Sequence, residues 1–151
     1  MLRARLKDAL TSAMKAKEDV TVATLRLILA ALKDRDIAAR SKGNFSGIED
    51  VAILEMLQSM IRQREESIAL YRNAGRDDLV EQETREIEII STFLPAQLSE
   101  EDMLAAIRET IDEIGATSLK DMGRTMGTLK ERFAGQMDFA RASAIVKEQL
   151  G

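Results

Sequence analysis

Residues 120–150 read KDMGRTMGTLKERFAGQMDFARASAIVKEQL, and the apolar pattern of this stretch sets the expected architecture. Apolar residues recur there every three or four positions, which is the period of a helix buried on one side. Gly135 and Asp138 interrupt the pattern. A glycine after the last periodic residue and an aspartate before the next are helix stop and start signals. We therefore predict one helix reaching Phe133 and another from Asp138 to Leu150.

The single proline, Pro95, precedes this stretch in the phrase FLPAQLSEED. Because proline disfavours helical geometry in the residue before it, the preceding helix is expected to stop there. We predict a hinge at residues 95–98 between a helical N-terminal domain, residues 1–94, and a tail domain, residues 99–151.

Two further helix starts are expected in the tail. Ser99 and Asp102 have the spacing of a capping box, and Gly115 is placed to end the helix that they begin. Ser118 and Asp121 repeat this spacing before the stretch quoted above. The tail is therefore expected to hold three helices.

The N-terminal domain is expected to hold four longer helices. The first includes Leu2 to Met14, the second runs from about Val20 to Ser41, and the fourth stops at Pro95. Ser46 is the expected N-cap of the third, and Gly75 is expected just beyond its end. With eight glycines, one proline and few clustered β-branched residues, little material is left for strands. The predicted fold is all-α: a four-helix domain plus a small three-helix tail.

Composition restricts the possible chemistry. The chain has no cysteine and no histidine, so it lacks disulfides, thiolate ligands and the side chain that titrates nearest neutral pH. We predict no catalytic residue, no metal site and no cofactor. The carboxylate groups worth testing for catalysis are Glu65 with Glu66, Glu81 with Glu83, and Glu86 with Glu88.

No apolar run approaches the length of a membrane span, and the N-terminus lacks the continuous apolar core of a signal peptide. The prediction is a soluble, cytoplasmic protein without a membrane partner.

Charge is unevenly distributed along the chain. Residues 1–42 carry a net charge of +5, residues 49–113 carry −11, and residues 117–151 carry +2. The basic ends could meet a polyanion, which the acidic middle would repel. The alternative interpretation is that these are solvated helix faces that keep the protein soluble.

Gly123 and Gly127 lie four residues apart, so on a helix they share one face and expose its backbone. Met122, Met126 and Leu129 are expected to pack in the core. Cations at nearby positions could follow a phosphate backbone, which positions a protein on nucleic acid without reading its sequence. The candidate nucleic-acid-binding residues are Lys120, Gly123, Arg124, Gly127, Lys130, Arg132 and Lys147, with Arg132 and Lys147 the weaker choices. Arg141 could extend the same surface.

Two further predictions concern single side chains. Arg26, set among leucines and an isoleucine, is expected to be partly buried and paired with an acid. One tyrosine, four phenylalanines and no tryptophan leave few platforms on which exposed bases could stack. This favours shape and phosphate contacts to a folded RNA.

The phrases FLPAQLSEED, KDMGRTMGTL and GQMDFARASAIVKEQL, together with TLRLILAALKDRDI at residues 24–37, closely resemble the YqeY-like family. That family is similar to the C-terminal region of GatB, one of the proteins that make up the glutamine-dependent aspartyl/glutamyl-tRNA amidotransferase. Arg124 stands where lysine is usual in the family, which keeps the charge. The resemblance implies an all-α protein of two parts, with a tail that recognises tRNA. It carries no catalytic residue onto this chain.

Three functions remain open. The first is a stand-alone tRNA-binding or accessory module related to the amidotransferase, a carbon–nitrogen ligase with glutamine as amido donor. The second is a non-catalytic adaptor that binds other protein subunits. The third is an independent enzyme that uses the carboxylate pairs named above.

Overall fold

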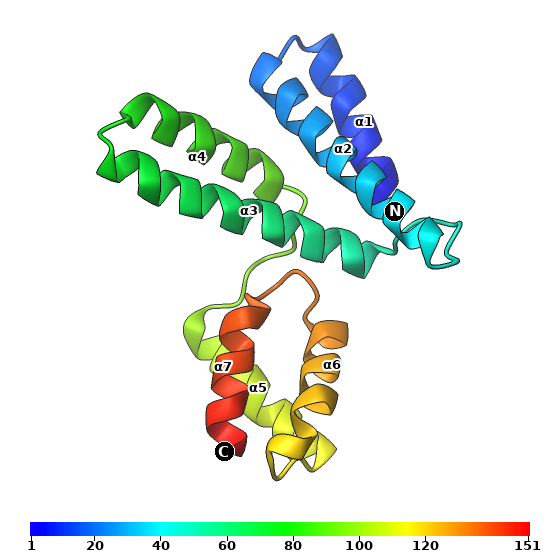
Figure 1. Cartoon of the computed structure of the whole chain (residues 1–151), viewed down its shortest axis with the longest axis vertical. Helices are drawn as coiled ribbons and strands as arrows, with labels where there is room; N and C mark the ends of the chain where they lie inside the picture. Colours follow the sequence, from blue (N-terminus) through cyan, green and yellow to red (C-terminus); the bar gives the residue numbers. More distant parts are fainter. The chain divides into compact units, whose positions relative to one another are not determined.

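The computed structural model describes residues 1–151 and confirms the all-α prediction. It contains seven α-helices, one short 3₁₀ helix and no strand (Figure 1). The helices group into two compact units, Met1–Leu94 and Pro95–Gly151. The hinge at residues 95–98 stays a prediction.

Two helical hairpins make up the first unit. Helices α1 (Leu2–Lys15) and α2 (Asp19–Ser41) form one, and helices α3 (Asp50–Asn73) and α4 (Asp77–Ser91) form the other (Figure 1). Helix α2 packs against α1, α3 and α4, so it connects the two hairpins.

The core of the first unit contains residues from all four helices. In α2 the buried residues Leu25, Ile28 and Leu32 follow the three-and-four spacing expected of one helix face. Removing a side chain of this size from water stabilises the fold by about 1.5–3 kcal/mol. Further buried residues of this core are Leu6, Ile53, Leu57, Ile90 and Phe93.

Two predicted helix limits in this unit are wrong. Helix α3 begins after Glu49, not after Ser46. The backbone N–H of Ser46 instead donates to the Asn44 side chain at 3.1 Å, which keeps this segment in a turn. Helix α4 ends at Ser91, because the N–H groups of residues 92–94 donate to carbonyls three residues back instead of four.

The second unit is a bundle of three helices. They are α5 (Glu100–Ile114), α6 (Met122–Arg132) and α7 (Phe139–Leu150), and the 3₁₀ helix η1 (Leu119–Asp121) leads into α6. Each of the three α-helices contacts the other two. Their shared core includes the fully buried Ile107, Leu129 and Val146.

The helix ends of this unit follow the predicted signals closely. The Ser99 hydroxyl accepts from the N–H of Asp102 at 3.1 Å, although only this half of the expected capping box forms. Gly115 ends α5 with φ +67°, a backbone conformation that glycine adopts without strain. Asp138 caps α7 by accepting from the N–H groups of Ala140 and Arg141.

Candidate nucleic-acid interface

Asp121 fixes the start of the helix that carries most of the predicted binding residues. One carboxylate oxygen accepts from the N–H groups of Thr117 at 2.9 Å and Ser118 at 3.3 Å, which completes the predicted capping box. These backbone hydrogen bonds, with a smaller contribution from Arg124, hold the pKa of Asp121 below its usual range. The carboxylate therefore stays charged and keeps the turn between α5 and α6 closed.

Two of the predicted binding residues are engaged within the unit. Arg124 donates to Asp121 at 3.0 Å and to the carbonyl of Ile114 at 2.9 Å, so it satisfies a free carbonyl at the end of α5. Arg132 forms an ion pair with Glu113 of α5. Both guanidinium groups are about half exposed, but each is held toward α5.

The remaining predicted residues of α6 lie on its other flank. At 100° per residue, Gly123, Gly127 and Lys130 fall within about 60° of one another, whereas Arg132 falls on the opposite side of the buried Leu129. Since Arg132 faces α5, the flank with the two glycines and Lys130 faces away from α5. In a bundle of three helices in mutual contact, this flank lies on the α7 side.

Helix α7 presents Lys147 toward the same region. Arg141, on one flank of α7, pairs with Glu100 of α5. Lys147 lies on the flank opposite Arg141, and therefore on the side of α6. Figure 1 shows α6 and α7 running in opposite directions, and η1 contacts α7, so Lys120 and Lys147 are at the same end of the bundle.

We call this surface the lysine–glycine face. None of its three lysines makes an ion pair. At 100° per residue, the exposed Glu131 and Glu148 border the face, each about 40° from its edge at Gly127 and Ala144. The residues between the lysines are small, which leaves a smooth surface between α6 and α7. The face consists of Lys120, Gly123, Gly127, Lys130, Ala140, Ser143, Ala144 and Lys147.

The two glycines of this face are open to solvent. A methyl group built at Gly123 or Gly127 would meet no atom within 4 Å. No other part of this chain therefore approaches the two glycines closely. As predicted, Leu129 lies in the core, with Met122 and Met126 packed against it.

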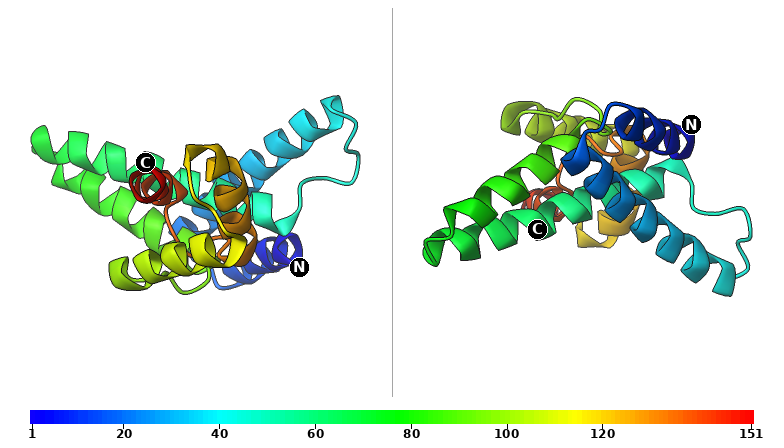
Figure 2. Two further views of the ribbon diagram at one scale, coloured as in Figure 1. Left: turned by 90° about the horizontal axis from the view of Figure 1, so that it is seen from below. Right: turned by 90° about the horizontal axis from the view of Figure 1, so that it is seen from above.

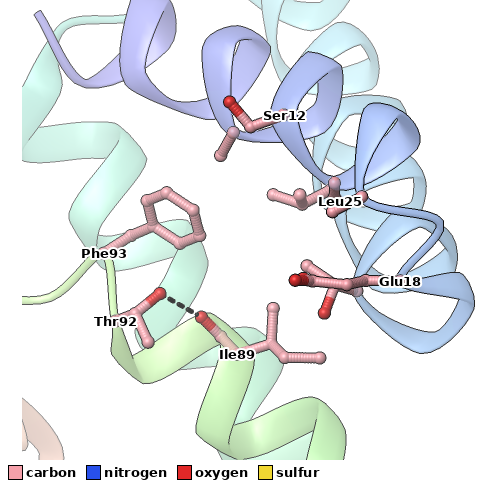
Figure 3. Close-up of a pocket in the computed structure, with 10 residues that line it drawn as sticks. Ser12, Glu18, Leu25, Ile89, Thr92 and Phe93 are labelled. Carbon is pink, nitrogen blue, oxygen red and sulfur yellow. Dashed lines mark hydrogen bonds between the residues drawn. The ribbon is translucent and has the colours of Figure 1, made fainter.

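A groove of about 420 Å³ lies in the first unit, between α1, α2 and the end of α4. Leu25 and Phe93 face each other across it (Figure 3). Its polar lining consists of hydroxyl groups and the carboxylate of Glu18, and the Thr92 hydroxyl is already bonded to the Ile89 carbonyl at 2.7 Å. The lining suits an apolar group and brings no pair of acid and base together.

The predicted carboxylate pairs lie mainly in the α3–α4 hairpin. Arg64 of α3 contacts Glu86 at 2.9 Å and Glu83 at 4.0 Å, all three largely buried. Burial, followed by the nearby charge of Glu86, raises the pKa of Glu83. No group of three or more acidic, histidine or cysteine side chains is placed to hold a metal ion, and no helix has the length and apolar character of a membrane span.

One predicted side-chain environment is wrong, and one exposed ring was not foreseen. Arg26 is exposed and makes no ion pair, because it lies on the outer side of α2, away from the buried stripe. Phe45 is 75% exposed in the loop between α2 and α3. A count of aromatic residues could not reveal this exposed ring, because only the path of the loop determines it.

The fold and this face define the class: a small all-α protein of two helical units, the second with an unpaired lysine surface. The sequence pattern of the family described as Yqey-like protein matches residues 3–150. The chain therefore belongs to the YqeY-like family.

Curated relatives come from yeasts and are called altered inheritance of mitochondria protein 41, mitochondrial. The one from Eremothecium gossypii is 33% identical over 116 residues, which cover 76% of this chain and 61% of the relative. The relative from Lachancea thermotolerans is 37% identical over 91 residues, which cover 60% of this chain and 46% of the relative. The chain thus spans about half to three fifths of the length of these relatives. Their names contradict the predicted cytoplasmic location, which we withdraw.

Proposed function

We propose that this protein binds tRNA through the lysine–glycine face and acts as an accessory module in the chemistry of glutamine-dependent tRNA amidation. In this proposal it holds the RNA by its phosphates, and the amidation itself is carried out by other proteins. The observation that carries the proposal is the set of three lysines without an ion pair around the exposed Gly123 and Gly127.

Charge and shape both support a phosphate backbone as the ligand. A lysine that makes no ion pair within the protein can release counterions from RNA without first breaking an internal contact. The small residues between the lysines let a bulky backbone approach α6 and α7 closely. Arg124 and Arg132 are weaker contributors, because their positions are set by contacts to α5.

Family membership gives separate support for tRNA as the RNA. The YqeY-like family is similar to the C-terminal region of GatB in the tRNA amidotransferase, and that region resembles a tRNA-recognition element. Phosphate contacts made in this way would position the tRNA and leave its identity to other elements.

Binding of tRNA to the purified protein over a salt series tests the proposal. The double variant Lys130→Glu/Lys147→Glu is expected to weaken binding and to flatten the dependence of log affinity on log salt by about two contacts. Arg108→Glu is the matched control: it changes the same type of charge in the same unit, on α5 and outside the face. If the Arg108 variant lost as much affinity for tRNA as a single lysine variant, the loss would follow from net charge and not from the position of the lysines. No binding of tRNA at low salt would refute the proposal.

The alternative is a non-catalytic adaptor that binds other proteins, and the acidity of α4 favours it. Its sequence, DDLVEQETREIEIIS, contains six carboxylates and one arginine. A protein partner recovered in stoichiometric amount after nuclease treatment, and lost when Glu81 and Glu88 become lysine, would support the adaptor.

A further inference from the structure

Helix α2 has two apolar stripes on opposite sides. Leu25, Ile28 and Leu32 belong to the buried one, described above. The second is exposed: Val20, Leu27 and Ile37 keep 41%, 49% and 52% of their surface in contact with solvent. We call it the outer seam, and it consists of Val20, Ala23, Leu27, Ala30, Asp34 and Ile37.

The spacing of the outer seam is that of a coiled coil. Its positions are separated by three, four, three, four and three residues, the alternation by which one helix keeps facing another. The spacing is also symmetric about the point between Ile28 and Leu29. The seam therefore has the same spacing when it is followed in the opposite direction along the helix. In that reversed order Val20 takes the place of Ile37, Ala23 that of Asp34, and Leu27 that of Ala30.

We propose that this chain forms a homodimer in which the outer seam of α2 packs antiparallel against the same seam of a second copy. A contact of this kind is isologous: each residue of one copy meets a residue of the other, and the reverse contact is made as well. The seam extends over about 25 Å at the helical rise of 1.5 Å per residue. It lies on a helix whose C-terminal part extends away from the tip of the α3–α4 hairpin (Figure 2).

Asp34 determines the direction of packing. In a parallel pair, the two Asp34 carboxylates would face each other between the two helices, where burial and like charge both oppose them. In the antiparallel pair, Asp34 lies opposite Ala23 of the second copy. The small alanine leaves the carboxylate room to reach solvent.

Charges beside the seam favour the antiparallel register at its ends. Asp19 of one copy comes opposite Arg40 of the second. Within the single chain the charge of Arg40 acts on Asp36, one turn away on α2, at a distance beyond that of an ion pair. In the middle, Arg26 meets Lys33 of the second copy, which is unfavourable. These side chains are long and exposed, so their charged ends can diverge in solvent.

A groove beside the seam suits the second copy. It has a volume of about 490 Å³ and lies between the start of α2 and α4. Val20 and Ala23 lie on its α2 side, and its lining contains four carboxylates and one arginine. Three of these carboxylates pair with arginines of the same chain, Asp78 with Arg76, Glu81 with Arg85 and Glu86 with Arg64, so Asp19 is the one without an ion pair. Ile37 of the second copy comes opposite Val20, and the basic end of that α2, with Arg40 and Lys42, follows it toward these acids. Apolar and electrostatic complementarity thus coincide in one register.

Cysteine cross-linking tests the register, and the chain has no cysteine of its own to interfere. A mixture of the variants Val20→Cys and Ile37→Cys is expected to form a disulfide-linked dimer under oxidation. Each variant alone is expected to stay unlinked, because identical positions lie about 25 Å apart in the antiparallel pair. Efficient linking of Val20→Cys to itself would show a parallel pair and overturn the proposal.

Two charge reversals in the full chain should change the dimer in opposite directions. Arg26→Glu converts a repulsion with Lys33 of the second copy into an attraction, made twice per dimer, and is expected to lower the dissociation constant roughly tenfold. Arg40→Glu removes the attraction to Asp19 of the second copy and is expected to raise the dissociation constant. Both replace one exposed arginine of α2, so an effect of net charge alone would move the constant in the same direction for both. That result would contradict the register.

Sedimentation equilibrium tests the dimer itself. Leu27→Asp is expected to give a monomer with unchanged helix content, because Leu27 is half exposed and outside the core. Leu70→Asp, at an exposed leucine on α3, is the control and should leave the dimer intact. An unmodified protein that stays monomeric at every accessible concentration would overturn the proposal.

Discussion

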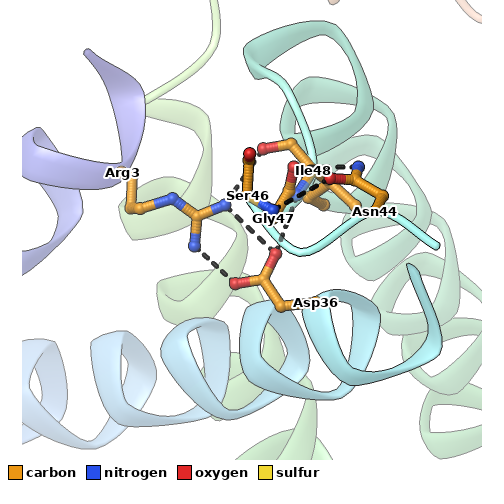
Figure 4. Close-up of polar contacts among 6 residues, drawn as sticks. All are labelled: Arg3, Asp36, Asn44, Ser46, Gly47 and Ile48. Atoms are coloured by element: carbon orange, nitrogen blue, oxygen red, sulfur yellow. Dashed lines mark hydrogen bonds and ion pairs between the residues drawn. The ribbon is translucent and has the colours of Figure 1, made fainter. Parts of the chain in front are cut away.

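Arg3 of α1 and Asp36 of α2 are joined by two hydrogen bonds, although 33 residues separate them in sequence (Figure 4). The same arginine donates to the carbonyl of Ile48 at 3.0 Å, and the N–H of Ile48 donates to Asp36 at 2.9 Å. One ion pair therefore holds two helices and the loop that leads into α3. The Arg3 guanidinium keeps the pKa of Asp36 below its usual range.

Asp36→Asn is expected to lower the free energy of unfolding at neutral pH by about 1–3 kcal/mol, the usual contribution of hydrogen bonds to a charged group. Since the folded-state pKa of Asp36 is lowered, its stabilisation is present above the unfolded-state pKa near about 4 and is lost as pH falls through the folded-state value. Urea unfolding from pH 7 to pH 3 should show the two proteins converging in acid. Asp8→Asn, an exposed carboxylate on α1, is the control.

Gly47 and Gly43 allow the Arg3 contact to be separated from backbone strain. Both have φ close to +90°, where any side chain is strained. A methyl group at Gly47 would also lie 2.7 Å from a guanidinium nitrogen of Arg3, whereas at Gly43 it would meet nothing. We expect thermal unfolding to rank the variants, with Gly47→Ala less stable than Gly43→Ala. If both variants lost the same stability, Arg3 would have to move away from the added methyl group without an energetic cost.

Gly123→Ala and Gly127→Ala are each expected to stabilise the protein by about 0.5–1 kcal/mol, because glycine in an exposed helix interior is unfavourable and the added methyl group meets no atom. If a phosphate backbone approaches this surface closely, the same variants should bind tRNA more weakly. Chemical denaturation and a binding titration measure the two effects. A gain in stability with unchanged affinity for tRNA would show that the two glycines do not contact the RNA.

Neutralising Glu83 and Glu86 should have opposite effects on stability. Burial raises the pKa of Glu83, so its charged form destabilises the fold at neutral pH, and this cost disappears as pH falls through the folded-state value. Glu83→Gln is therefore expected to raise the melting temperature at pH 7, with an advantage that shrinks in acid. Glu86→Gln, which weakens the 2.9 Å contact to Arg64, is expected to lower it. A loss of stability in both variants would contradict this account.

Local signals made the second unit the more predictable one. Ser118 with Asp121, Gly115 and Asp138 act within a few residues of themselves, and the structure places each of them at the expected helix end. Ser46 was wrongly predicted to cap α3. Its N–H group donates to the Asn44 side chain, which places Ser46 in a turn before the helix. Which cations are paired could not be read from the sequence, because Arg132 and Arg141 meet their partners 19 and 41 residues away.

The sequence by itself determined the helical class, most helix ends and the family, because capping, helical periodicity and glycine conformation are local properties of the chain. Only the tertiary structure decided that Lys120, Lys130 and Lys147 stay unpaired while Arg124, Arg132 and Arg141 contact α5. It also separated the two apolar stripes of α2 into a buried and an exposed one. The physical reason is that burial and ion pairing depend on which helices pack together, and residues far apart in sequence make those contacts.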